Sequence, residues 1–304
     1  MSTQLELSVV VCTFNRQRYL LKALEHLGDQ TAGHASYEVI IVDNNSPDET
    51  ELMCRQYIDC HPDLNIHYYK ELQQGHSFAR NRGIKESSGS YIAFIDDDAY
   101  VRSDYVANLI SHFDEHPDTM ALGGKILPIY ETQEPAWMST YLLPLVAALD
   151  MGEKPKPFKG TKYPIGANMA FRSECFVRHG LFDPDFGRKG DSLEGGDEKE
   201  LFLRLKRHQE TIYYVPTVVV DHIIPERRLQ KEYIKGLGTG VGSTERRRVS
   251  KLSISAKLFK IWEEVYKMAG TIVLSLLYCL SLQFSKAKML IRFRFWVWQG
   301  LFRG

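Results

Sequence analysis

The first 130 residues alternate between short apolar runs and amphipathic stretches, and this rhythm constrains the fold more than any other feature. Three apolar runs of strand length lie at 7–12, 37–42 and 91–95, and residues 65–70 could form a further strand between the last two. Strands that alternate with helices form a mostly parallel sheet with helices on both faces. We therefore predict an α/β fold, with the intervening helices at 16–27, 48–60, 77–86 and 104–113.

Polar side chains follow three of these strands at the point where each strand ends. In open sheets of this kind, ligands bind beside the carboxyl ends of the strands. We expect the polar groups there to share one ligand site, although they are far apart in the chain. The residues concerned are Thr13, Asn15, Asp43, Asp96, Asp97 and Asp98.

The acidic run that closes the fourth strand predicts a metal site. Side chains alternate along a strand, so Asp96 and Asp98 should point the same way. Paired carboxylates suit Mg²⁺ or Mn²⁺, which usually bind through one or two carboxylates together with substrate phosphates. A diphosphate leaving group gains most from such an ion, because the metal neutralises charge as it develops. The plainer interpretation of the acidic run is a solvated turn.

An aspartate and two arginines suit a nucleotide pocket. Asp43 ends the second strand, where a carboxylate can accept a hydrogen bond from a base or a ribose hydroxyl; it could instead cap the next helix. Arg80 and Arg82 could contact a base or a diphosphate, or form a basic helix surface. No G-x-G-x-x-G follows the first strand, which argues against a dinucleotide cofactor.

The middle of the chain predicts an acceptor region. Residues 130–165 are rich in proline and show little periodicity, so we expect a long loop, in which Trp137 could stack on an acceptor sugar or be partly buried. Order returns at 165–172, where Asn168 offers a donor and an acceptor for sugar hydroxyls. A helix is expected at 197–207, followed by one or two strands at 211–221.

The C-terminal region predicts contact with an anionic surface. Residues 226–304 hold 16 Lys and Arg, 5 Glu and no Asp, a net charge of +11 in a chain of zero net charge. Residues 269–284 are apolar but shorter than the roughly 20 residues that span a bilayer. Residues 286–303 mix Lys and Arg with Trp and Phe, which is typical of a helix in the lipid interface.

We expect this extension to lie on a membrane surface, with packing on the core or a true span as alternatives. Nucleic acid is a weaker alternative partner, because the apolar run and the tryptophans favour lipid over a phosphate backbone. The five cysteines form no Cys-x-x-Cys and indicate reduced thiols. We therefore expect a cytoplasmic protein on the inner face of the cell membrane; its oligomeric state is left open.

The sequence resembles glycosyltransferase family 2, which has the GT-A fold with a Rossmann-like sheet. The resemblance covers about residues 7–225, and residues 226–304 follow as the extension. The segments that carry it are VVVCTFNR (9–16), VIIVDNNSPD (39–48), GHSFARNRGIKESSGSYIAFIDDD (75–98), GANMAFR (166–172) and GDEKELFLRL (196–205). By this resemblance, residues 1–130 bind a nucleotide sugar, and residues 131–225 bind the acceptor and hold the catalytic base.

The resemblance also implies roles for individual residues. Thr13, Asp43 and Arg80 correspond to residues that line the nucleotide pocket. Asp96 and Asp98 correspond to those that hold ribose, metal and diphosphate, with Asn15 and Asp97 beside them. His222 matches a histidine that can complete the metal site in relatives, and otherwise is a histidine at a strand end.

The same resemblance places a catalytic base at the start of the 197–207 helix. Relatives usually show Glu-Asp there, whereas this chain has Asp197 followed by Glu198. Register favours Glu198 and side-chain type favours Asp197, so both stay candidates; helix capping is the plainer role. A carboxylate near a helix N-terminus is stabilised in its charged form, as a base that accepts a hydroxyl proton requires.

The sequence thus predicts an inverting, metal-dependent transferase that moves a sugar from a nucleotide sugar to a glycan or a lipid-linked glycan. A UDP-sugar is favoured, although Asp43 and Arg80 are also compatible with guanosine or thymidine. One alternative is a sugar-phosphate nucleotidyltransferase, but residues 13–18 lack the glycines of its phosphate loop. The other is an inactive binding module of the same fold, which the retained acidic residues disfavour.

Overall fold

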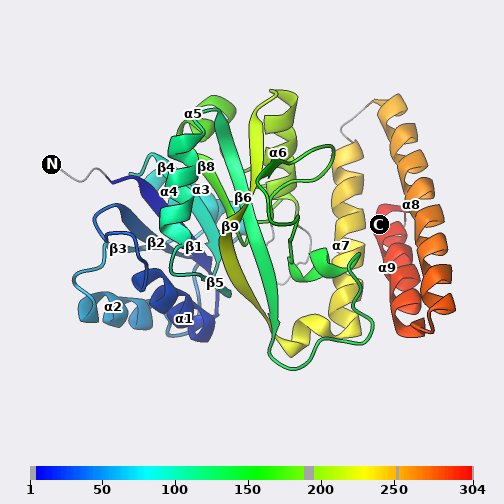
Figure 1. Ribbon diagram of the computed structural model, residues 1–304, viewed down its shortest axis with the longest axis horizontal. Coiled ribbons are helices and arrows are strands. Elements are labelled where there is room, and N and C mark those ends of the chain that lie inside the picture. Colours follow the sequence, from blue (N-terminus) through cyan, green and yellow to red (C-terminus); the bar gives the residue numbers. More distant parts are fainter. Residues whose placement is uncertain (1–4, 188–194, 251–252, 303–304) are drawn as a thin grey trace. The chain divides into compact units, whose positions relative to one another are not determined.

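The computed structural model describes residues 5–187, 195–250 and 253–302, with only the backbone of 254–257 (Figure 1). The chain forms two compact units. The first contains the described residues up to 129, 147–187 and 197–223, and the second contains 130–146, 195–196 and the described residues from 224 onward. Of the loop predicted at 130–165, residues 130–146 therefore belong to the second unit and residues 147–165 to the first.

Four parallel strands form one half of the sheet in the first unit. Their order is β3 (Ile66–Lys70), β2 (Tyr37–Asp43), β1 (Leu7–Thr13) and β4 (Tyr91–Asp96). All of β2 and nearly all of β1 is buried, which explains why these strands are continuous apolar runs. The predicted α/β fold is confirmed, and the predicted strands agree with the observed ones to within one residue at each end.

Alternation along the strands divides the core into two layers, one on each face of the sheet. Val9 and Val11 contribute to one layer, and Val10 to the other. The first layer packs against α1 (Gln17–Gly28), α2 (Thr50–Cys60) and α4 (Tyr105–Glu115). The second packs against α3 (His76–Glu86), α5 (Glu174–His179) and α6 (Asp197–Arg207), so helices cover both faces.

The other half of the sheet contains antiparallel strands. After β4 come β8 (Met169–Arg172), β6 (Thr119–Tyr130), β9 (Thr211–Ile224) and β5 (Ala99–Val101), and β7 (Lys156–Pro157) also pairs with β9. The sequence did not predict β5, β6 or β7. Glycines interrupt the apolar pattern of β6, and one is required there, because a Cβ at Gly124 would lie 1.9 Å from the carbonyl oxygen of Val218.

The second unit is mainly helical. Its long helices are α7 (Lys231–Ser250), α8 (Ile254–Leu280) and α9 (Phe284–Phe302), preceded by the short turns η1 (Leu143–Val146) and η2 (Glu226–Leu229). α9 packs against both α7 and α8. Its approach to α7 is close, since a Cβ at Gly300 would lie 2.0 Å from the carbonyl oxygen of Thr239. Among the described residues, no helix combines the length and apolar character needed to cross a bilayer.

Candidate active site

The carboxyl ends of β1, β2 and β4 lie together at one edge of the sheet, as the sequence predicted. Thr13 pairs in register with Asp43 of β2, and its neighbour Cys12 pairs with Asp96 of β4. The Thr13 hydroxyl donates a 2.8 Å hydrogen bond to Oδ2 of Asp97. Three strand ends that are distant in the sequence therefore deliver polar groups to one place.

Asp96, Asp98 and His222 form a set that fits a divalent cation. One ligand atom from each residue lies within 4.8 Å of the others, and Asp98 and His222 are fully buried. His222 comes from β9 and pairs in register with Ala99 of β5, and its Nε2 lies 3.2 Å from Oδ1 of Asp98. Two carboxylates and an imidazole suit Mn²⁺ or Mg²⁺.

Arg16 is a residue of this site that the sequence analysis did not single out. Its Nη1 lies 2.8 Å from Oδ1 of Asp97 and 2.7 Å from Oδ2 of Asp98. Its buried Nε and Nη2 have no hydrogen-bond partner among the described residues. Those N–H groups could therefore donate to a phosphate oxygen. The signal was a basic residue directly after the polar end of β1, within the segment VVVCTFNR.

Crowding of the acidic run affects its titration. Burial raises the pKa of Asp97 to about 6 against the opposing effect of Arg16, and the charge of Asp98 adds to the rise. A cluster of carboxylates with one arginine carries surplus negative charge, which a divalent cation would neutralise. Burial also raises the pKa of the neighbouring Cys12 thiol to about 12, which favours its protonated form.

The residues that were predicted to contact the nucleotide differ in how accessible their side chains are to a ligand. Asp43 is fully buried, and its two oxygens accept hydrogen bonds from the Ser46 amide and from the Tyr68 hydroxyl, at 2.8 and 2.7 Å. Asn15 is exposed, with a positive φ of 53°, a conformation that asparagine tolerates. Asp43 thus shapes the loop after β2, while Asn15 stands at the surface beside the end of β1.

A second charged cluster joins α3 to α6. Arg80 is 1% exposed, and its guanidinium donates from Nη1 to Asp197 at 3.0 Å and from Nη2 to Glu198 at 2.9 Å. The structure therefore pairs Arg80 with the two candidate bases. Arg82, in contrast, pairs with Glu86 on its own helix.

The two candidate bases differ in their environment. Burial would raise the pKa of Asp197, but the charge of Arg80, together with His76 and hydrogen bonds that include one from Ser77, holds this pKa below its ordinary value. Burial raises the pKa of Glu198, and the negative charges of Asp197 and Asp96 raise it further against Arg80. Two adjacent carboxyls with pKa values pushed in opposite directions are typical of acid–base sites.

Gly166 allows this cluster to form. Its amide donates to Oε2 of Glu198 at 3.0 Å, and a Cβ on this residue would lie 2.2 Å from both Glu198 and Arg80. The backbone before β8 therefore approaches the carboxylate directly, and Glu198 is fixed from two sides while about a quarter of its side chain stays exposed. Asp197 is 3% exposed and is thus the less accessible of the two.

The two predicted acceptor residues lie in different units. Asn168 is fully buried, and its amide group donates to the carbonyls of Lys125 and Val218 and accepts from the Tyr105 hydroxyl. These contacts tie β8 to its neighbours, and they do not favour the predicted contact with sugar hydroxyls. Trp137 lies half-buried in the second unit, and its role toward an acceptor stays a prediction.

The chain is similar to characterised glycosyltransferases. It is 27% identical over 235 residues to a glucosyl-dolichyl phosphate glucuronosyltransferase of Haloferax volcanii, covering 76% of this chain and 73% of that one. It is 26% identical over 238 residues to a dolichyl N-acetyl-α-D-glucosaminyl phosphate 3-β-D-2,3-diacetamido-2,3-dideoxy-β-D-glucuronosyltransferase of Methanococcus voltae, covering 75% and 70%.

A solved structure shares the fold. The mannosyltransferase PcManGT from Pyrobaculum calidifontis, in complex with GDP-Man and Mn²⁺, has a TM-score of 0.68 at 17% identity over 98% of this chain and 88% of that one. The sequence profile described as Glycosyl transferase family 2 matches residues 8–180, more than half of the 304 residues. The chain therefore belongs to glycosyltransferase family 2 and has the GT-A fold.

Proposed function

We propose that this glycosyltransferase moves a sugar from a nucleoside diphosphate sugar to an acceptor hydroxyl and inverts the anomeric centre. The observation that carries the proposal is the pairing of two different charged clusters at one sheet. An acid-rich group of Asp96, Asp98 and His222 fits a divalent cation, and an arginine-held carboxylate pair fits a base. The charge of Asp96 acts on the pKa of Glu198, so the two clusters influence each other.

Asp96, Asp98 and His222 would hold Mn²⁺ or Mg²⁺, which when bound supplies positive charge against the departing diphosphate. Arg16, already paired with Asp97 and Asp98, would donate its remaining N–H groups to the same phosphates. Thr13 fixes Asp97, and the exposed Asn15 would lie beside the nucleotide. Asp43, held by Tyr68, keeps the loop after β2 in shape for the base.

Glu198 is the proposed base. Its raised pKa and partial exposure suit a carboxylate that accepts the proton of the acceptor hydroxyl. As the proton leaves, the acceptor oxygen forms a bond to the anomeric carbon, and the bond to the diphosphate oxygen breaks with its electron pair. Attack from one face and departure from the other invert the centre. Asp197 keeps Arg80 in place for this step.

The acceptor is proposed from the relatives. Both archaeal relatives carry names of enzymes that act on dolichyl phosphate-linked sugars. We propose a lipid-linked glycan acceptor in polysaccharide or glycoconjugate assembly, with the C-terminal unit touching the inner face of the cell membrane. The +11 charge of residues 226–304 supports this contact, because anionic lipid attracts cationic segments.

A screen of nucleotide sugars tests the proposal. Binding of UDP-, GDP- and dTDP-sugars is measured by calorimetry with and without Mn²⁺. At least one donor, which we expect to be a UDP-sugar, should bind about tenfold or more tightly when the ion is present. NMR of the transfer product should then show an inverted anomeric configuration. Equal donor binding without the ion, or a retained configuration, would contradict the proposal.

A further inference from the structure

Helix α8 of the second unit buries its polar residues and exposes its apolar ones. Between Leu258 and Leu280, four residues are buried and all four are polar: Lys260, Glu264, Thr271 and Ser275. The residues that are exposed in the same span are apolar or aromatic, apart from one glycine, and none is charged. They are Leu258, Phe259, Ile261, Trp262, Val265, Tyr266, Ala269, Gly270, Ile272, Val273, Leu276, Leu277 and Leu280.

Ion pairs occupy the inward face of α8. Lys260 Nζ lies 3.1 Å from Glu245 of α7 and 3.0 Å from Glu264 on its own helix. Glu264 also lies 3.2 Å from Nη1 of Arg294 on α9, so the network joins the three helices. Farther along, the Ser275 hydroxyl donates to the carbonyl of Ala287 on α9 at 3.4 Å. Polar groups therefore fix the rotation of α8 within its unit.

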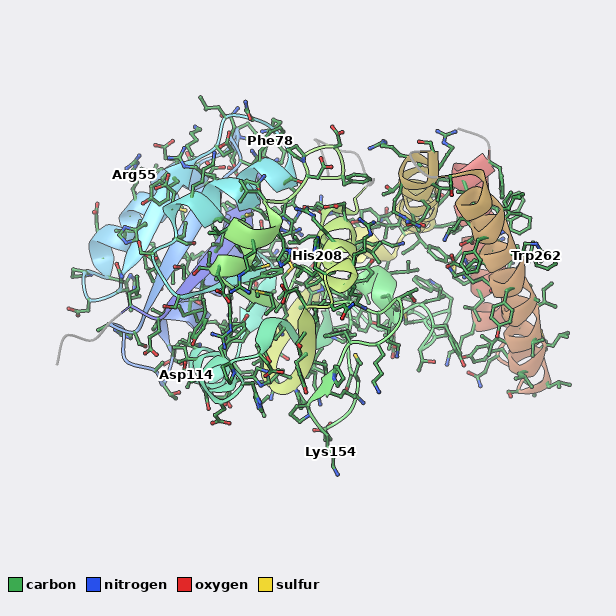
Figure 2. The ribbon with its side chains drawn as sticks, turned by 90° about the horizontal axis from the view of Figure 1, so that it is seen from above. Arg55, Phe78, Asp114, Lys154, His208 and Trp262 are labelled. Atoms are coloured by element: carbon green, nitrogen blue, oxygen red, sulfur yellow. The ribbon has the colours of Figure 1, made fainter. Side chains whose placement is uncertain are left out.

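This arrangement leaves a continuous apolar surface, which we call the outer face of α8. At 1.5 Å per residue it runs for about 33 Å. Its aromatic residues stand well out, with Phe259 73% and Trp262 72% exposed. Figure 2 shows Trp262 on the side of α8 turned away from α7. A helix in water shows the opposite pattern, and an apolar patch of this size marks an interaction surface.

We infer that the outer face of α8 lies in the interfacial layer of an anionic membrane. This deepens the proposed membrane contact, on which it rests, and is independent of the proposed transfer reaction. It differs from the sequence expectation, which placed the lipid-facing helix at 286–303. The structure buries much of that stretch, including Trp296 and Leu301, and packs α9 against both α7 and α8; Arg303 lies outside the described residues.

The net charge of the C-terminal residues favours lipid over a second copy of the chain as the partner of the outer face of α8. Residues 226–304 carry a net charge of +11, so two such units face to face would repel each other. The same charge draws the unit to anionic lipid, and the outer face then buries its aromatic and aliphatic groups among the acyl chains. Because one face of α8 carries ion pairs and only the other is apolar, the helix would lie along the surface.

Flotation of the full-length protein with vesicles tests this inference. The vesicles contain phosphatidylcholine with about one third phosphatidylglycerol, a charge density comparable to anionic leaflets. The wild type should float with them, and the triple variant Phe259→Ser, Trp262→Ser, Leu280→Ser should bind about tenfold or more weakly. Its circular dichroism and thermal midpoint should stay unchanged, because these side chains are exposed.

Two matched variants locate the effect. Leu52→Ser, Leu72→Ser, Val177→Ser removes exposed apolar residues of the first unit, and Phe295→Ser, Phe302→Ser removes those of α9. Neither should weaken flotation as the α8 triple variant does. If the α9 variant alone loses binding, or if the α8 triple variant floats like the wild type, the outer face of α8 is not the lipid surface and the inference fails.

Absence of wild-type flotation would overturn both this inference and the proposed membrane contact. Light scattering tests whether a second copy of the chain covers the outer face instead of lipid. If the wild type is a dimer and the α8 triple variant is a monomer, the face is assigned to a second copy. Donor binding is measured by calorimetry on the same samples. Its retention in the triple variant shows that a loss of flotation concerns the membrane alone.

Discussion

The two units of this protein both bury charged groups, but they differ in the ratio of carboxylates to cationic side chains. In the first unit, Asp96, Asp97 and Asp98 share Arg16 and His222, which leaves surplus negative charge. In the second, both glutamates of the buried network have more than one cation beside them: Glu245 pairs with Arg248 and Lys260, and Glu264 pairs with Lys260, Lys267 and Arg294. Burial of charge therefore does not by itself mark an active site. A cluster with surplus negative charge favours binding of a cationic ligand. Carboxylates that are all paired with Lys or Arg instead link the helices that carry them.

The largest expected effect comes from removing surplus charge in the first unit. Asp98→Asn keeps the shape of a fully buried side chain but removes one proposed metal ligand and one of the two carboxylates that pair with Arg16. We expect sugar transfer to fall by about 10³-fold, because loss of electrostatic stabilisation at a reacting centre has effects of this size. Initial rates with Mn²⁺ measure it.

The control is Glu174→Gln, which breaks an exposed ion pair with Arg178 on α5. It should leave the transfer rate unchanged, because surface pairs contribute little. Full activity of the Asp98→Asn protein would contradict this contrast between the two units, because the acidic cluster of the first unit would then need no cation.

The second test separates the two candidate bases. Glu198→Gln should lower kcat by about 10²- to 10⁴-fold with little change in donor affinity, as expected for loss of a general base. Asp197→Asn should act more weakly on kcat, through misplacement of Arg80, which then loses one partner. Steady-state kinetics of both variants check this, and a larger loss in Asp197→Asn would transfer the role to that residue.

The pH profile sharpens the same point. As the proposed base, Glu198 must be deprotonated to accept a proton. Burial raises its pKa, so kcat/KM should fall as pH drops through a value above that of an ordinary glutamate. Below that pKa the fall should approach tenfold per pH unit. Asp197, with a lowered pKa, stays ionised throughout this range. An acid limb below the ordinary carboxyl range would instead indicate Asp197.

The smallest effect on transfer is expected from the second unit. Lys260→Met leaves Glu245 and Glu264 without their shared partner, and breaking a buried ion pair costs about 3–5 kcal/mol. The thermal midpoint of the helical unit should fall while donor binding is kept. Lys267→Met is the control, because Lys267 is more exposed and pairs with residues of its own helix. Equal effects of both would contradict the network's role.

The parallel half of the sheet was predictable because its signals are local. Apolar runs that are buried on both faces, each closed by a polar residue, identify β1, β2 and β4 and the edge at which they meet. The antiparallel half gave weaker signals. β5 has only three residues, and β6 contains Gly123 and Gly124, which the packing of other segments requires.

Side-chain partners in the site were harder to predict, since they depend on segments far apart in the chain. Arg80 was expected at the nucleotide, but its closest partners are Asp197 and Glu198, more than 100 positions later. Asn168 carries groups suited to a sugar and uses them inside the sheet. The outer face of α8 could not be predicted from the sequence for a similar reason, because the ion pairs that set the rotation of α8 involve residues of three helices.

The pairing of β5 with β9 has a consequence for biosynthesis. His222 reaches Asp98 only when β9 is in place beside Ala99, and the Ile223 amide then donates to the Asp98 carbonyl. A nascent chain that has emerged only as far as Asp98 holds the carboxylates but lacks the imidazole and the strand that positions it. The proposed cation site is therefore completed only after most of the chain has left the ribosome, and products truncated before β9 would lack its histidine.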